Sequence, residues 1–291
     1  MMLSDVSPSP DGKKLYVVGN LFRGELMRYD RKTAEFVPFL SGISADHIDF
    51  SKDGQWVTYV SFPEDTLWRS KTDGSERLQL TDLPARLPCW SPDGKTIAFY
   101  TQNPLKIYKV SSEGGTASQL MPNEPGPQLD PYWSPDGGKI VFAGNGQDPA
   151  STIRVLDLAT HQVTTLPGSQ GMFSPRWSPD GRYICAHSSD STRLLVFDFQ
   201  TQKWSELAKG YLGFPSWSKD GRYLQLLDFT GKGTVIRVGL KDAKIERVVD
   251  LKDFSQTGIW GFWLGTAPDD SPLLLRDTGS QDVYSLDWQE P

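Results

Sequence analysis

The histidines, cysteines and small motifs of the chain do not form a pattern that predicts catalysis. The three histidines, His47, His161 and His187, lack the short spacing that metal ligands show. The sequence contains neither a Gly-x-Ser-x-Gly nucleophile elbow nor a Gly-x-x-x-x-Gly-Lys-(Ser/Thr) phosphate loop. Cys89 and Cys185 lie in apolar segments, where small buried thiols are expected. We therefore expect no enzyme activity, no metal site and no cofactor.

Charged residues near a recurring aromatic position are the first candidates for ligand binding. They precede the aromatic residue at the point where strands would enter a central channel, and ligands commonly bind at such mouths. A mixed ring of charges there suits a small anion, a sugar or the end of a peptide. Ordinary solvated surface pairs are the alternative. The candidates are Asp46, His47, Arg86, Asp130 and Arg176.

An aromatic cluster near the C-terminal end is the second candidate. Aromatic side chains form ligand platforms, but they also fill the space between packed sheets, which is the alternative interpretation here. The cluster comprises Trp260, Phe262, Trp263, Tyr211 and Phe214.

The element that positions these residues is a repeat. Ser-(Pro/Lys)-Asp-Gly recurs at intervals of 40 to 49 residues, which is the period of a four-stranded propeller blade. Proline presets the turn, aspartate caps its own backbone and glycine takes positive φ. Such spacing puts each carboxylate on a separate blade, too far apart to share a calcium ion. The turn aspartates are Asp11, Asp53, Asp93, Asp136, Asp180 and Asp220, with a degraded seventh copy at Asp269.

The segments between the turns predict an all-β chain. Apolar strands follow each turn, alternation is clear in 153–158, and no segment has sustained helical periodicity. An aromatic residue precedes most turns and is expected to pack between blades. These residues are Phe50, Trp90, Trp133, Trp177, Trp217 and Trp263.

We predict one propeller domain over residues 1–291, with about seven four-stranded blades. The last blade has no fourth strand after Trp288 unless upstream residues supply it, so we expect an incomplete blade in a truncated product of a larger protein. A strained ring of six blades is the alternative.

Composition restricts the partners. With 30 basic and 36 acidic residues the chain has a formal net charge of −6, which disfavours nucleic acids and anionic lipids as main partners. No segment approaches the ~20 apolar residues of a membrane-spanning helix. The N-terminal residues lack the basic and apolar regions of a signal peptide.

The pattern Trp-Ser-Pro-Asp-Gly-(Lys/Arg) resembles the WD40-like repeat of TolB-type β-propellers, over essentially the whole chain. The segments 24–30, 39–45, 67–70 and 73–81 resemble the C-terminal propeller of acidobacterial regulators. In those proteins the propeller follows a winged-helix or serine/threonine kinase domain, neither of which is present in this sequence. The resemblance implies the fold and a sensing or scaffolding role. It favours the periplasm, whereas the missing signal peptide leaves the cytoplasm open.

Two functions follow as hypotheses. The first is a non-catalytic propeller that binds a protein or peptide partner in a bacterial regulatory system. The alternative is a propeller hydrolase or lyase, or the propeller gate of a peptidase, with its site at the channel mouth. A bound metal or a cluster of close, buried carboxylates in the channel would favour the alternative.

Overall fold

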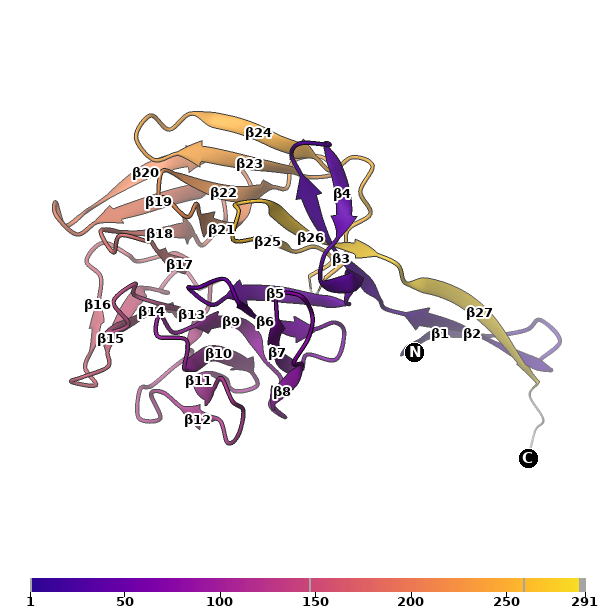
Figure 1. Cartoon of the computed structure of the whole chain (residues 1–291). Helices are drawn as coiled ribbons and strands as arrows, with labels where there is room; N and C mark the ends of the chain where they lie inside the picture. Colours follow the sequence, from indigo (N-terminus) through magenta and orange to yellow (C-terminus); the bar gives the residue numbers. More distant parts are fainter. Residues whose placement is uncertain (1, 147, 259, 288–291) are drawn as a thin grey trace.

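A computed structural model of the chain describes residues 2–146, 148–258 and 260–287, which form seven antiparallel β-sheets (Figure 1). Six sheets have four strands and one has three. The prediction of an all-β propeller is confirmed, and of the predicted seven blades six are complete four-stranded sheets while the seventh sheet has three strands. Within the described ranges the one helix is the short 3-10 turn η1 (Leu40–Gly42), and none is long and apolar enough to cross a membrane.

Five blades are continuous in sequence, and each runs outward from its first strand to its fourth. The first is β5 (Ala45–Phe50), β6 (Trp56–Ser61), β7 (Leu67–Lys71) and β8 (Leu78–Thr81). The second is β9 (Arg86–Trp90), β10 (Thr96–Gln102), β11 (Leu105–Ser111) and β12 (Ser118–Gln119). The third is β13 (Leu129–Trp133), β14 (Lys139–Ala143), β15 (Ile153–Asp157) and β16 (Val163–Thr165). The fourth is β17 (Met172–Trp177), β18 (Tyr183–Ser188), β19 (Arg193–Asp198) and β20 (Lys203–Lys209). The fifth is β21 (Leu212–Trp217), β22 (Tyr223–Asp228), β23 (Thr234–Gly239) and β24 (Ile245–Asp250).

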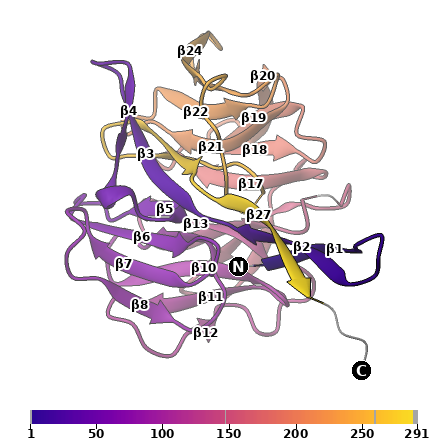
Figure 2. The ribbon, with the colours of Figure 1, turned by 90° about the vertical axis from the view of Figure 1, so that its right-hand side faces the viewer.

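The sixth blade joins the two ends of the chain. Its inner strands are β25 (Leu264–Thr266) and β26 (Pro272–Asp277), and its outer strands are β3 (Gly24–Asp30) and β4 (Glu35–Pro38). The innermost strands contact one another in the order β5, β9, β13, β17, β21, β25 and back to β5. Six blades therefore close a ring around a central axis, as in the six-blade alternative (Figures 1 and 2).

The three-stranded sheet lies outside this ring, and we call it the arm. It consists of β1 (Met2–Pro8), β2 (Lys14–Leu21) and β27 (Ser280–Asp287), in the order β1-β2-β27 (Figure 1). In the five continuous blades the second and third strands pair as a hairpin. In the first and last repeats the second strand does not pair with the third strand of its own repeat. Instead β26 of the last repeat pairs with β3 of the first, and β2 of the first pairs with β27 of the last.

The sequence of β27 gives a physical reason for the exchange. Leu26 of β3 lies opposite Leu275 of β26, and both side chains are buried. If β26 turned back on itself through Thr278 and Gly279, the hairpin would set Asp282 opposite Leu275. Burying that carboxylate between blades is costly, so β3 is the better third strand.

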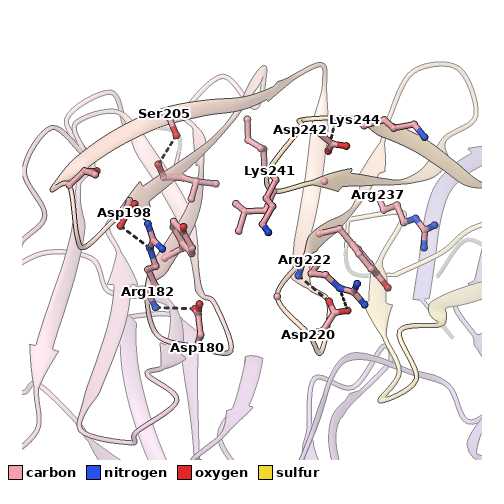
Figure 3. A pocket seen from close by; sticks show the side chains of 18 of the residues that line it. Asp180, Arg182, Asp198, Ser205, Asp220, Arg222, Arg237, Lys241, Asp242 and Lys244 are labelled. Carbon is pink, nitrogen blue, oxygen red and sulfur yellow. Dashed lines mark hydrogen bonds and ion pairs between the residues drawn. The ribbon is translucent and has the colours of Figure 1, made fainter.

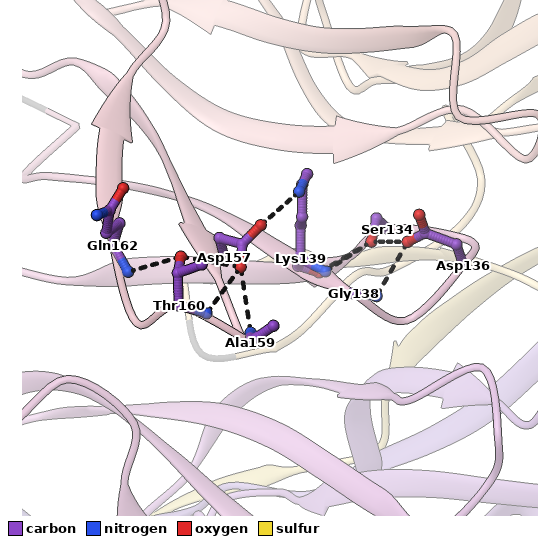
Figure 4. Close-up of polar contacts among 8 residues, drawn as sticks. All are labelled: Ser134, Asp136, Gly138, Lys139, Asp157, Ala159, Thr160 and Gln162. Carbon is purple, nitrogen blue, oxygen red and sulfur yellow. Dashed lines mark hydrogen bonds and ion pairs between the residues drawn. The ribbon is translucent and has the colours of Figure 1, made fainter.

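The repeated turn has one set of hydrogen bonds in successive blades. In the third blade, Ser134 Oγ donates to Asp136 Oδ1, which also accepts the Gly138 N–H at 2.9 Å; Ser134 Oγ in turn accepts the Lys139 N–H at 2.9 Å. Gly137 takes a φ of 74° at the corner. Figure 3 shows the equivalent turns at Asp180 and Asp220, and Figure 4 shows the one at Asp136. The predicted blade turns are thus built by side-chain to backbone hydrogen bonds.

Aromatic residues before these turns are buried between blades. Trp133 Nε1 donates to the Cys89 carbonyl of the preceding blade at 3.2 Å, and Trp217 Nε1 donates to the Arg176 carbonyl at 3.1 Å. Trp263 does not belong to this series. The pairing of Thr266 with Pro272 puts Thr266 directly before the turn, and Trp263 lies three residues earlier.

Candidate functional site

The wall of the central channel is shaped by an irregularity that recurs in the inner strands. In five of them the pairing to the second strand shifts near a residue with left-handed backbone, and in four of the five a proline follows that residue. A bulge of this kind bends the strand and redirects its side chains. The left-handed residues are His47, Leu87, Asp130, Ser174 and Phe214, with φ between 43° and 55°.

A cavity of about 100 Å³ lies where these inner strands meet. Five blades each contribute the residue directly before the blade aromatic. In the sixth blade this position is Gly265, where a Cβ would collide with the Trp263 indole, so the indole fills that part of the wall. The five contributed residues are Asp49, Cys89, Tyr132, Arg176 and Ser216.

The predicted charged residues Asp46, His47, Arg86 and Asp130 lie in the first half of their inner strands and are buried, whereas Arg176 is the next-to-last residue of β17. Asp46, His47 and Arg86 are 2 to 3% exposed and Asp130 is 9% exposed, whereas Arg176 is partly exposed. His47 and Arg176 line the cavity. The four buried residues are therefore not solvated charges at the rim of the channel, whereas Arg176 is partly solvated.

The five residues do not form one cluster. Asp46 Oδ1 lies 2.8 Å from His47 Nδ1, and Asp130 interacts electrostatically with both Arg176 and His47. Arg86 instead forms an ion pair with Asp65 in the loop between β6 and β7, and it donates to the Ala85 carbonyl at 2.8 Å.

Asp49 is the carboxylate of the cavity wall that sequence reasoning missed. One of its oxygens accepts the Trp90 N–H at 2.7 Å. Burial raises the pKa of Asp49 to about 6, against this hydrogen bond and the opposing effect of Arg176. Burial also raises the pKa of Asp130, which Arg176 and His47 partly offset. Asp49 therefore titrates close to neutral pH.

Arg176 is the cation on which this part of the wall depends. Its guanidinium lies over the Tyr132 ring, 5.5 Å from the centroid, and donates to the Pro175 carbonyl at 2.8 Å. Its charge lowers the pKa of Asp49 and Asp130, although burial has the larger effect on both. Arg176 therefore offsets part of the desolvation cost of one buried carboxylate, Asp130, and one partly buried carboxylate, Asp49.

His187 on β18 is a buried base that sequence reasoning did not single out. It is 1% exposed, and neither ring nitrogen has a hydrogen-bond partner among the described residues. Burial, followed by the charge of Arg176, lowers the pKa of His187 to about 4. His47 Nε2 and Arg86 Nε also have no partner within the described ranges. These polar atoms are retained at a cost in stability.

Aromatic side chains form the opposite side of the channel mouth. The rings of His47 and Trp260 meet edge to face at 5.3 Å, and Trp260 is 44% exposed. Phe214 contacts both Trp260 and Phe262, with each pair of centroids 6.1 Å apart. Tyr211 joins them through Phe229, whereas Trp263 is buried in the core between the blades. The channel mouth therefore has one solvent-accessible indole, that of Trp260, beside His47, one ring nitrogen of which has no hydrogen-bond partner among the described residues.

A larger groove of about 1040 Å³ lies between the fourth and fifth blades (Figure 3). Its lining carries charges of both signs, and several form ion pairs within one blade, as in Arg182 with Asp198 at 2.9 Å and Arg237 with Glu246 at 2.7 Å. The groove therefore has no concentrated charge. Among the described residues no group of three or more His, Cys, Asp or Glu is placed to hold a metal ion.

Comparison with known proteins places this geometry in a family. The chain is 27% identical over 238 residues to an uncharacterized protein of Agrobacterium fabrum, covering 73% of this chain and 80% of that protein. It is 28% identical over 166 residues to the uncharacterized peptidase YuxL of Bacillus subtilis, which is 54% of this chain but only 24% of the peptidase. The fold is similar to that of a putative TolB from Agrobacterium tumefaciens, with a TM-score of 0.69 and 21% identity, covering 88% of this chain and 98% of that one. The family model described as the TolB beta propeller domain matches residues 47–211. The chain therefore belongs to the TolB β-propeller domain family.

Proposed function

We propose that the chain is a non-catalytic propeller that binds a protein or peptide partner at the channel mouth, as a sensory or scaffolding module of a bacterial regulatory system. The observation that carries this proposal is the set of titratable groups around the channel that burial displaces toward the neutral form, beside ring nitrogens of His47 and His187 that lack hydrogen-bond partners among the described residues. Asp49, Asp130 and His187 each have a pKa displaced toward the neutral form by burial. Displaced pKa values of this kind concentrate at functional sites.

The mouth suggests the chemistry of the partner. Trp260 offers an exposed apolar surface, and His47 beside it has one ring nitrogen without a partner among the described residues. A ligand with an apolar or aromatic side chain can pack on the Trp260 indole, and a backbone group of the same ligand can hydrogen-bond to His47. A short peptide or an exposed loop of another protein has these two parts. The regulatory role is supported by the resemblance of the segments 24–30 and 39–45 to regulator propellers.

Selection from a random peptide library tests the proposal. We expect the full chain to enrich peptides with a shared aromatic or apolar position, and Trp260→Ala to weaken their binding at least tenfold. Ile245→Ala is the matched control, because Ile245 is similarly exposed on the outer strand β24. If no peptide is enriched, or if the two variants lose binding equally, the proposal is wrong.

The propeller gate of a peptidase is the second candidate. The similarity to YuxL favours it. The His47–Asp46 pair, which is a common arrangement for a general base, instead favours the other form of the alternative, hydrolysis by the chain itself. Its test is hydrolysis of the same peptide library by the purified chain alone and with a peptidase domain of that family. Cleavage by the chain alone that His47→Gln abolishes would replace the binding proposal with an enzyme.

A further inference from the structure

The arm has one apolar face and one polar face. Antiparallel partners point to the same side of a sheet, so the pairings Val17–Val6, Val17–Tyr284 and Leu15–Leu286 define one face. Leu3, opposite Gly19, extends it. The apolar face consists of Leu3, Val6, Leu15, Val17, Leu21, Tyr284 and Leu286. Its one charged residue is Asp282, opposite Gly19.

The opposite face is more polar, with four apolar exceptions. Ser4 lies opposite Val18, and Ser7 and Ser285 lie on either side of Tyr16. Alternation of this kind is typical of a sheet with one face in water and the other against a core. The polar face consists of Ser4, Ser7, Lys14, Asn20, Gln281, Ser285 and Asp287, with Met2, Tyr16, Val18 and Val283.

Most of the apolar face of the arm is exposed among the described residues, whereas Val17 at its centre, between Val6 and Tyr284, is buried. Leu3 is 59% exposed, Val6 is 61% exposed and Leu286 is 52% exposed. Of the twelve large hydrophobic residues that are exposed within the described part of the chain, five lie on this face, namely Leu3, Val6, Leu21, Tyr284 and Leu286, and three lie on the opposite face, namely Met2, Tyr16 and Val283. Sheets of the ring have neighbouring blades against both faces. A contiguous apolar face of this kind marks an interaction site.

We propose that the apolar face of the arm docks on the same face of a second copy of the chain. Two such faces are complementary to each other, because both are apolar at the centre and the single carboxylate lies toward one end. Packing them about a two-fold axis makes a small β-sandwich, with the polar faces outward. A partner recognised by charge would require charged residues that this face does not have.

The size of the face sets the strength of the dimer. Three strands about 4.8 Å apart and seven or eight residues long make a face roughly 14 Å by 25 Å. Two such faces cover about 700 Å² in total, which is below the size of stable specific interfaces and fits a weak, transient contact. The dimer is therefore expected to dissociate on dilution. Because each copy carries a net charge of −6, added salt should strengthen it.

Sedimentation equilibrium of the full chain tests this proposal, over a concentration range from about 1 µM to about 100 µM. The wild type should show a monomer–dimer equilibrium. Leu286→Asp on the apolar face should weaken the dimer at least tenfold, and Leu3→Asp on β1 should do the same. Val283→Asp is the matched control, since Val283 lies on the same strand, is more exposed at 68% and points to the other face.

Circular dichroism and thermal unfolding show whether each variant keeps the propeller. A wild type that stays monomeric at every concentration would overturn the proposal, and so would equal weakening by Leu286→Asp and Val283→Asp. A monomer that binds another protein through this face would show that the occupant is not a second copy. None of these results depends on peptide binding at the channel.

Discussion

Aspartates in two regions of the propeller have opposite electrostatic surroundings. At the outer turn of the third blade, hydrogen bonds from Ser134 and from the Gly138 N–H lower the pKa of Asp136 (Figure 4). In the channel wall, burial raises the pKa of Asp49 to about 6 despite the Trp90 N–H and Arg176. An ionised aspartate therefore stabilises the fold at the blade turn but destabilises it in the channel wall. A group retained against stability points to a role in function.

Removing the charge of Arg176 should give the largest decrease in the free energy of unfolding. Arg176→Met is expected to lower the free energy of unfolding by about 3 kcal/mol at pH 8, because it leaves buried carboxylates without their counter-charge. The loss should be smaller below pH 6, where Asp49 is protonated. Denaturant unfolding at several pH values measures it. Adding Asp49→Asn to this variant should recover most of the lost stability, and a strictly additive pair would contradict the coupling.

Removing the charge of Asp49 from the channel wall should raise the free energy of unfolding, which is the opposite of the change expected for Arg176→Met. The pKa of Asp49 is raised from 3.8 to about 6, so its contribution to stability is fully present below pH 3.8 and is lost as the pH rises through 6. Asp49→Asn resembles the protonated form at every pH. Its gain in unfolding free energy should therefore grow above pH 4 and reach about 3 kcal/mol by pH 8. A variant less stable than the wild type at pH 8 would show that the charged form is the stabilising one.

His187 provides the reverse pH dependence in the same region. Its pKa is lowered from 6.5 to about 4, so its contribution to stability is present above pH 6.5 and is lost as the pH falls through 4. His187→Leu should gain about 2 kcal/mol over the wild type at pH 5, and less at pH 8. The unfolding free energies of the two proteins at those two pH values check this. An equal gain at both would mean that packing, not titration, sets the difference.

A substitution in the blade turn at Asp136 should give the smallest change in the free energy of unfolding. Asp136→Ala removes the acceptor for Ser134 Oγ and the Gly138 N–H, and is expected to cost about 1 kcal/mol at neutral pH. Because the pKa of Asp136 is lowered, its contribution is present above pH 3.8 and is lost as the pH falls below that value. Asp136→Asn keeps an acceptor and should lose less. Thermal unfolding of both variants at pH 7 ranks them.

The repeat made the blades and their turns predictable, because Ser-Pro-Asp-Gly encodes local hydrogen bonds that need no tertiary information. Candidate residues were located by their distance from the blade aromatic, and of these residues His47 and Arg176 line the cavity. Asp49 was missed because the left-handed residue three positions before that aromatic changes which side chains face the channel. The prolines that follow it in four blades, as at Pro131, were the available signal.

The exchange of partners between the first and last repeats could not be predicted from local patterns. A two-residue connection such as Phe22-Arg23 favours pairing of β2 with β3. The choice is made by burial at a distance, where Leu26 of β3 fits opposite Leu275 better than Asp282 of β27. Competition of this kind between segments far apart in the chain leaves no mark on the sequence near either one.

Peptide capture by the double variant Asp49→Asn/Arg176→Met tests the central claim most directly. This variant removes one charge of each sign from the cavity wall and is expected to be about as stable as the wild type, so a loss of capture cannot be attributed to unfolding. If the channel charges serve a ligand, peptides selected on the wild type should bind the double variant at least tenfold more weakly. Equal binding of those peptides to a folded double variant would contradict the account.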